Sequence, residues 1–216
     1  MIHVYCYELN EGFQKKSFDK LLCSLPNEIQ IRIRRFRNWE DQQASLIGKL
    51  LIRKGLHDLG SYNDDPLNRL QYNSFQKPFI EGNINFSISH SGRFVVCAIS
   101  DINMLGIDIE QIRSIDVSPF KTHMTPNEWN EINKAIDKTA AFYSYWTKKE
   151  AVVKAIGKGL NIPLKSFSIR ENKTTIDNQT WYLKKLNVGN ENICHLALDE
   201  KVKQEQLVFQ KIGEIE

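Results

Sequence analysis

The chain has 216 residues, which is enough for one large domain or for two small domains with separate cores. Hydrophobic residues make up 41% of it and charged residues 25%, an ordinary composition for a soluble globular protein and not that of a disordered one. The 29 basic and 26 acidic residues leave a net charge of +3. This balance argues against a general nucleic-acid binder, because such proteins neutralise many phosphates.

The sequence carries no sign of secretion or of membrane insertion. Residues 1–5 have neither the basic segment nor the apolar run of a signal peptide, and no apolar stretch approaches the length that spans a membrane. The four cysteines are scattered and form no C-x-x-C pair, which favours small, reduced core residues. They are Cys6, Cys23, Cys97 and Cys194. We expect a cytoplasmic protein with no membrane partner.

The first half of the chain predicts a strand, two helices and a β-hairpin, in that order. Apolar residues of the second helix recur every three or four positions, and Gly60 follows it as a candidate C-cap. Ser91 and Gly92 form the turn of the hairpin, and its second strand is a continuous apolar run, typical of a buried strand. The expected elements are a strand at 2–9, helices at 27–36 and 41–59, a turn-rich connector at 61–68, an extended stretch at 70–80, and hairpin strands at 86–90 and 94–99.

The second half predicts a similar order of elements. They are a strand at 105–109, helices at 126–136 and 138–156, and strands at 166–170, 180–186 and 193–198. Gly157 and Gly159 end the longer helix. Strand, helices, long helix and strands therefore occur twice, which indicates a weak internal duplication. We expect an α+β fold of two similar halves, 1–103 and 104–216, that pack closely together.

The first motif with chemical content is the segment Gly106–Glu110. Alternate side chains of a strand share a face, so Asp108 and Glu110 should point together while Ile107 and Ile109 enter the core. Two neighbouring carboxylates repel each other unless a cation lies between them, and Mg²⁺ binds one or two carboxylates together with substrate phosphates. By itself, a D-x-E pair on a strand is more often a solvated acidic face, so both readings remain open.

The second motif lies on the long helix of the second half. Glu150, Lys154 and Lys158 are spaced by four residues and should share one helical face. The carboxylate could supply a third oxygen to a metal while the lysines meet phosphate. An ordinary ladder of exposed ion pairs explains the same spacing, so this motif is also ambiguous alone.

The third motif is the hairpin turn, where Ser89 and His90 stand near its mouth. Hydroxyl, imidazole and backbone N–H groups at such a turn suit a phosphate. A nucleophilic Ser/His pair is a weaker interpretation, since neighbours on a strand point to opposite faces and no G-x-S-x-G elbow is present. His90 could instead be a hydrogen-bonded turn histidine.

In this order, the segments Ser89–Gly92, Gly106–Glu110 and Trp146–Lys154 resemble the signature blocks of 4′-phosphopantetheinyl transferases. The spacing is similar to that of the large, surfactin-type members, and the likeness covers about residues 26–170. It implies two α/β halves packed as an intramolecular pseudo-dimer, and a monomer. It also implies an enzyme that moves the 4′-phosphopantetheine group of coenzyme A to a serine of an apo acyl or peptidyl carrier protein, with Mg²⁺ as cofactor and 3′,5′-ADP as the second product.

The resemblance also assigns roles to single residues. Metal binding falls to Asp108, Glu110 and Glu150, and catalysis to Glu150, Asp108 and Lys154. Coenzyme A contacts fall to Arg32, Lys77, Ser89, His90, Lys149 and Lys154. Two positions depart from the family pattern, because Ala44 and Ile29 stand where basic residues are expected. These departures put in doubt the number of groups that hold the 3′-phosphate of coenzyme A.

Two further expectations and two alternatives remain. Glu150 is our candidate acceptor for the serine proton, and residues 119–129 are the candidate surface for the carrier protein. A degenerate member of the family that binds coenzyme A or a carrier protein without transfer is the main alternative. An RNA-binding domain that uses the basic cluster at 32–37 is a weaker one, given the balanced net charge.

Overall fold

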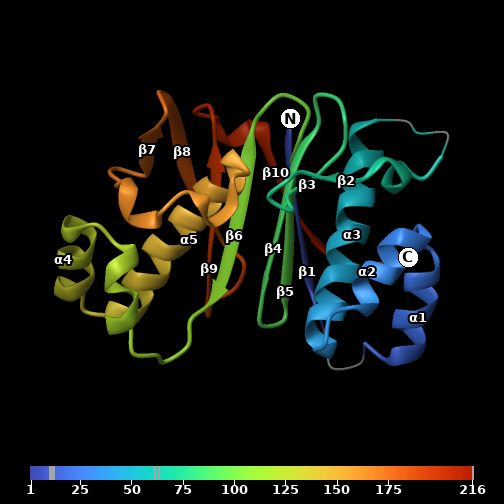
Figure 1. Ribbon diagram of the computed structural model, residues 1–216, viewed down its shortest axis with the longest axis horizontal. Helices are drawn as coiled ribbons and strands as arrows, with labels where there is room; N and C mark the ends of the chain where they lie inside the picture. Colours follow the sequence, from blue (N-terminus) through green and yellow to red (C-terminus); the bar gives the residue numbers. More distant parts are fainter. Residues whose placement is uncertain (10–12, 61, 63, 216) are drawn as a thin grey trace.

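The computed structural model describes residues 1–9, 13–60, 62 and 64–215, which form an α+β fold with two four-stranded sheets and a small two-stranded one (Figure 1). The first half contains β1 (Ile2–Glu8), α1 (Lys15–Cys23), α2 (Asn27–Arg34), α3 (Trp39–Leu59), β2 (Gln71–Tyr72), β3 (Pro78–Phe79), β4 (Asn85–Ser91) and β5 (Phe94–Ser100). The second half contains β6 (Leu105–Gln111), α4 (Pro126–Lys134), α5 (Lys138–Ile156), β7 (Lys173–Ile176), β8 (Gln179–Leu186), β9 (Asn192–Leu198) and β10 (Leu207–Ile212).

The two large sheets share a three-stranded core of the same topology. In the first, β5 lies between β1 and β4; in the second, β9 lies between β6 and β8, and all four pairings are antiparallel. Each half therefore runs strand, helices, long helix and hairpin, with the second hairpin strand in the middle of the sheet. The predicted fold class, α+β with two similar halves, is confirmed.

The molecule is built in four layers, with α3 and α5 outside and the two sheets between them (Figure 1). Alternation along β1 explains this arrangement: Val4 and Cys6 face the second sheet, whereas Tyr5 and Tyr7 belong to the core under α3. The core between the sheets also contains Ile107 and other buried apolar side chains of β5, β6 and β9. One face of each sheet thus packs on the other sheet and the opposite face packs on a helix.

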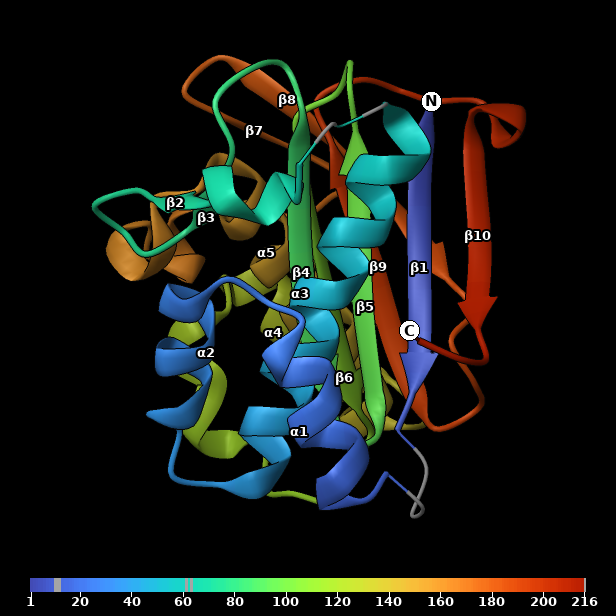
Figure 2. The same cartoon turned by 90° about the vertical axis from the view of Figure 1, so that its right-hand side faces the viewer.

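The last strand of the chain lies in the first sheet, although it follows the second half in the sequence. β10 pairs in parallel with β1, from Ile2 opposite Leu207 to Tyr7 opposite Ile212, and so extends the first sheet (Figure 2). Residues 207–212 therefore belong to the sheet of the first half. The pairing joins segments some two hundred residues apart in the sequence, and local patterns carry no information about such contacts.

Several elements differ from the predicted ones in type or in bounds. The strand expected at 166–170 is wrong, because a short 3₁₀-helix and a loop occupy that segment. The helix expected at 126–136 ends at Lys134, and α1 and β7 were not predicted at all. Of the connector expected at 61–68, residues 61 and 63 lie outside the described part of the chain. The long helix at 138–156 is confirmed, and Gly157 ends it with a left-handed φ of 77°.

The cysteines are free, and three of them are buried as expected, whereas Cys23 is exposed and its prediction as a core residue is wrong. None of the helices in the described ranges is both long enough and apolar enough to cross a membrane.

Candidate active site

The site begins at the seam where β4 of the first sheet lies beside β6 of the second (Figure 1). Three serines alternate along β4, and each hydroxyl oxygen accepts a hydrogen bond from a backbone N–H of β6. Ser87 accepts from Ile107 (3.1 Å), Ser89 from Ile109 (3.3 Å) and Ser91 from Gln111 (3.0 Å). These hydroxyls satisfy N–H groups that would otherwise lack a partner, since β6 pairs with β9 on its other edge.

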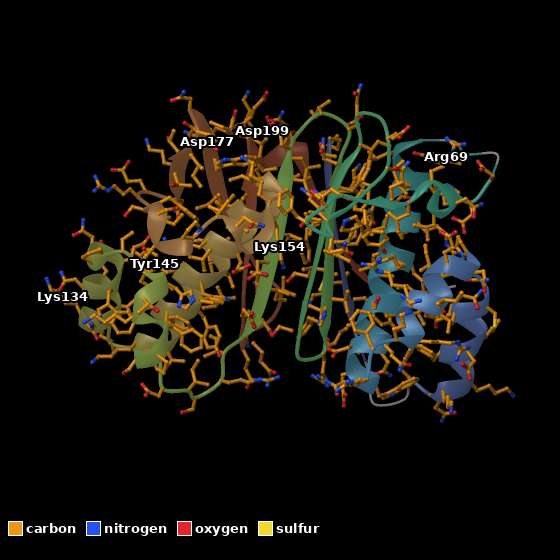
Figure 3. The ribbon with its side chains drawn as sticks, in the orientation of Figure 1. Arg69, Lys134, Tyr145, Lys154, Asp177 and Asp199 are labelled. Atoms are coloured by element: carbon orange, nitrogen blue, oxygen red, sulfur yellow. The ribbon has the colours of Figure 1, made fainter. Side chains whose placement is uncertain are left out.

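Two of these hydroxyls also hold the acidic side chains of β6. The Ser89 hydroxyl donates to Asp108 Oδ1 (2.9 Å), and the Ser91 hydroxyl donates to Glu110 Oε2 (2.9 Å). Lys154 of α5 donates to Asp108 Oδ1 (2.6 Å) and to Ser89 Oγ (2.8 Å), and it lies at the centre of the molecule between the halves (Figure 3). The structure thus joins side chains from β4, β6 and α5.

A glycine explains why β6 and α5 approach so closely. A Cβ at Gly106 would lie 2.1 Å from the carbonyl oxygen of Ala151 and 2.3 Å from the backbone nitrogen of Ala155. The two backbones therefore touch at Gly106, and two residues further along the same face Asp108 meets Lys154. The predicted alternation is confirmed as well, because Ile107 and Ile109 are completely buried in the core between the sheets.

The carboxylates influence one another. Burial raises the pKa of Glu110, and the charge of Asp108 raises it further. Burial also raises the pKa of Glu150, again with a contribution from Asp108, while Lys154 opposes the shift. The three acidic side chains that were predicted to share a metal are therefore close enough to repel each other.

The free oxygens of these carboxylates determine whether the cluster can hold a metal ion. Within the described residues, no group of three or more His, Cys, Asp or Glu side chains has an arrangement that would hold an ion as it stands. However, Asp108 Oδ2 is buried and has no hydrogen-bond partner, which is costly for a carboxylate oxygen. A hard divalent cation prefers such oxygen donors, so the residues present fit Mg²⁺.

Two cavities meet at this cluster. The central cavity, of about 280 Å³, lies between the halves and is lined by residues 75–78, 86–88, 150, 153, 154, 157 and 159. The lateral cavity, of about 220 Å³, lies in the first half and is lined by residues 29, 32, 33, 36, 41, 44, 45, 49, 72, 76, 78, 88–90 and 95. Gln76, Pro78 and Ile88 line both, so the cavities are neighbours.

The predicted coenzyme A residues divide between these cavities. Arg32, Ser89 and His90 line the lateral cavity, and Lys77 and Lys154 line the central one. Desolvation and the charge of Lys154 lower the pKa of His90. Arg32 stacks over the ring of Tyr72 at 3.8 Å, and its guanidinium donates to Gln76 Oε1 (2.7 Å).

Lys77 has a structural contact besides its place in the central cavity. Its ammonium donates to the carbonyl oxygen of Ala155 (3.0 Å), and Asn73 donates to that of Gly157 (3.1 Å). A loop of the first half thereby satisfies carbonyl groups at the C-terminus of α5 in the second half. Burial lowers the pKa of Lys77 to about 8.

Two lysines of the predicted set lie elsewhere. Lys149 is completely buried, pairs with Glu128 of α4 (3.0 Å), and lines neither cavity. Lys158 follows the end of α5 and pairs with the exposed Asp177 (3.6 Å), so it does not share a helical face with Glu150 and Lys154. The structure separates Lys149 from the other residues predicted to bind coenzyme A.

Sequence reasoning missed Lys49 and Tyr72, which both line the lateral cavity. Lys49 could have been noticed as a lone charge within the run Leu46–Ile52, whose other residues are all buried and, Gly48 excepted, aliphatic. No comparable signal marks Tyr72.

Comparison with known proteins identifies the family. The family model of the 4′-phosphopantetheinyl transferase superfamily matches residues 104–201, and that of the 4′-phosphopantetheinyl transferase N-terminal region matches residues 13–102. The 4′-phosphopantetheinyl transferase gsp of Aneurinibacillus migulanus is 38% identical over 177 residues, which are 81% of this chain and 73% of the relative. The chain belongs to the 4′-phosphopantetheinyl transferase superfamily. A 4′-phosphopantetheinyl transferase of Bacillus subtilis is 36% identical over 70% of this chain and 69% of its own length, and the Sfp transferase of Bacillus subtilis strain 168 is 30% identical over 77% and 75%.

Membership of this superfamily confirms the predicted family and the prediction that the chain is a phosphopantetheinyl transferase. It gives no support to the alternative of a degenerate binding module, and each of the three predicted metal carboxylates is present in the sequence.

Proposed function

We propose that this phosphopantetheinyl transferase binds coenzyme A across both cavities and modifies a serine of an apo acyl or peptidyl carrier protein. The cluster of Ser89, Asp108 and Lys154 carries this proposal, because it joins the two cavities. A diphosphate bound there would reach both Ser89 in the lateral cavity and Lys154 in the central one. We place the 3′-phosphate end of coenzyme A in the lateral cavity, beside Arg32 and His90.

We also propose that Asp108, Glu110 and Glu150 hold Mg²⁺ beside that diphosphate. The unpartnered Asp108 Oδ2 and the mutual repulsion of the three carboxylates support this assignment. A bound Mg²⁺ would neutralise charge on the diphosphate and on the departing nucleotide. Lys154 adds a fixed positive charge at the same place, where negative charge develops as the bond to the leaving group breaks.

The transfer itself needs one nucleophile and one proton acceptor. The carrier serine oxygen attacks the phosphorus that bears the pantetheine arm. The bond from that phosphorus to the bridging oxygen breaks, and 3′,5′-ADP leaves with the electron pair. The serine proton passes to Glu150, which lines the central cavity and whose carboxylate has no hydrogen bond or ion pair among the described residues.

The surroundings of the site suggest how the carrier protein reaches it. We place the carrier on residues 119–129, where a 3₁₀-helix (Ser118–His123) leads into α4 and Lys121 and His123 are exposed. An acidic carrier would complement these side chains. One chain supplies both cavities, so we propose a monomer, and its free cysteines suit the reducing cytoplasm.

Intact-protein mass spectrometry tests the proposal directly. Apo acyl and apo peptidyl carrier proteins are incubated with the enzyme, coenzyme A and Mg²⁺, and each should gain the mass of one phosphopantetheine group, with loss of the reaction in EDTA. Asp108→Asn should reduce the rate by at least about 100-fold, because it replaces one carboxylate oxygen with an NH₂ group and removes the negative charge beside Lys154.

Asp177→Asn is the matched control, since Asp177 is an exposed acidic residue outside both cavities. It should transfer at the wild-type rate. A fully active Asp108→Asn enzyme would overturn the proposed role of the cluster, and a wild-type enzyme that modifies neither carrier would overturn the proposed reaction.

A further inference from the structure

Lys49 occupies an unusual place for a charged side chain. It lies in the middle of α3 with only 6% of its surface exposed, and its neighbours on both sides, Gly48 and Leu50, are buried. Its side chain lines the lateral cavity beside Ala44 and Ser45, which precede it on the same helix. A lysine is almost never buried in this way without a partner.

No partner for the Lys49 ammonium is found in the described residues. It has neither a hydrogen bond nor an ion pair there, in contrast to the buried Lys149, which contacts Glu128 and two carbonyl oxygens. Burial and the positive charge of Arg32 lower the pKa of Lys49 to about 8. An unpaired buried charge lowers the stability of the folded state. A buried lysine without a partner beside a cavity therefore indicates a site for a ligand of opposite charge.

The other polar groups of the lateral cavity are also arranged for an anion. Arg32 and His90 lie at its exposed margin, and the buried hydroxyl of Tyr72 has no hydrogen-bond partner. Asp41 is the single carboxylate among the lining residues, and it accepts a hydrogen bond from Asn38 at the start of α3. Arg32 and Lys49 therefore give the lining two basic side chains against one carboxylate.

The two departures from the family pattern both line the lateral cavity. Ile29 and Ala44, which stand where basic residues are expected, are both buried side chains that line the lateral cavity. Neither can neutralise a phosphate. Lys49 places a cation in that cavity from a different position on the helix.

We propose that Lys49 is the cation at the base of the lateral cavity that binds the 3′-phosphate of coenzyme A, with Tyr72 and Arg32 as further donors, and that it distinguishes coenzyme A from dephospho-coenzyme A. The inference rests on the proposed function, since it takes coenzyme A as the ligand. A phosphate dianion would satisfy the ammonium and the free hydroxyl together.

Calorimetric titration of the intact enzyme with coenzyme A and with dephospho-coenzyme A tests this role. Lys49→Met keeps the length of the side chain and removes its charge, and it should weaken coenzyme A binding by about 10- to 100-fold. Binding of dephospho-coenzyme A should not change. The unfolding temperature of the ligand-free variant should equal or exceed that of the wild type, because an uncompensated charge has been removed.

Lys54→Met is the matched control, because Lys54 lies on the same helix but pairs with Asp58 outside the lateral cavity. It should bind both ligands as the wild type does, and Lys49→Gln should repeat the effect of Lys49→Met. If the wild type transfers phosphopantetheine, two results would overturn the inference. One is that both Lys49 variants bind coenzyme A as tightly as the wild type, and the other is that they lose affinity equally for coenzyme A and dephospho-coenzyme A. If the wild type neither binds coenzyme A nor modifies a carrier, the proposed function fails first.

Discussion

The buried pair of Glu128 and Lys149 offers the sharpest test of how the second half is held together. Glu128 Oε2 accepts from Lys149 (3.0 Å) and from the backbone N–H of Thr125 (2.9 Å), and Oε1 accepts from that of Ile169 (2.8 Å). Within the described residues, every hydrogen bond and ion pair of this carboxylate is therefore with a donor. Glu128→Gln places an amide N–H₂ group against one of them and leaves the lysine charge without its counterion.

Breaking a buried ion pair by removing one partner costs about 3 to 5 kcal/mol. Glu128 and Lys149 are 2% and 0% exposed, so water cannot replace the missing partner. For a chain of this size, 1 kcal/mol corresponds to about 2 to 4 °C in the unfolding temperature, so Glu128→Gln should lower it by about 6 to 20 °C. Urea unfolding of the two single variants and of the double variant Glu128→Gln/Lys149→Met measures the coupling free energy between the two side chains. The double variant should be more stable than the sum of the two single losses predicts.

The same variants decide the role of Lys149. If it is structural, Lys149→Met should destabilise the protein while the folded enzyme keeps its affinity for coenzyme A. A Lys149→Met enzyme with wild-type stability and weakened coenzyme A binding would refute this reasoning and restore the role that the family resemblance implied.

Two further predictions concern the seam and a buried histidine. Ser91→Ala removes the hydroxyl that holds Glu110. The proposed Mg²⁺ should raise the unfolding temperature, and this rise should be smaller for Ser91→Ala than for Ser87→Ala, because the Ser87 hydroxyl contacts no carboxylate among the described residues. Equal responses of the two variants would contradict a positioning role for Ser91. His195 is buried against Thr147, and burial lowers its pKa to about 3. Below about pH 6.5 the unfolded chain binds a proton at His195 and the folded chain does not. The contribution of the neutral His195 to the free energy of unfolding is therefore complete above pH 6.5 and falls by up to about 1.4 kcal/mol per pH unit towards pH 3. Urea unfolding from pH 7 to pH 4 should show a free energy of unfolding that depends less on pH for His195→Asn than for the wild type. Parallel curves for the two proteins would contradict the role of His195 in this pH dependence.

Much of the fold could be read from local patterns. The long helix at 138–156, the hairpin on either side of Gly92 and the alternation of Ile107 with Asp108 all follow from side-chain spacing over a few residues. The order of elements also showed the duplication, since both halves use strand, helices and hairpin in the same sequence.

Other parts of the fold depended on contacts distant in the sequence. Residues 166–170 have the composition of a strand, but the Phe167 carbonyl accepts from Lys149 and the Ile169 N–H donates to Glu128, so these groups do not form a ladder. β10 is a strand because β1 offers it an edge, and that edge belongs to the opposite end of the chain.

The residue types and spacings were enough to determine the family, the α+β class and the acidic and basic side chains around Asp108. Only the tertiary structure shows which charge, if any, lies beside each lysine. Lys149, Lys154 and Lys49 look alike in a sequence. In the structure Lys149 pairs with Glu128 and Lys154 with Asp108, whereas Lys49 lines a cavity and has no ion pair among the described residues. The free energy of a charge depends on burial and on the nearest opposite charge, and both are set by packing between distant segments.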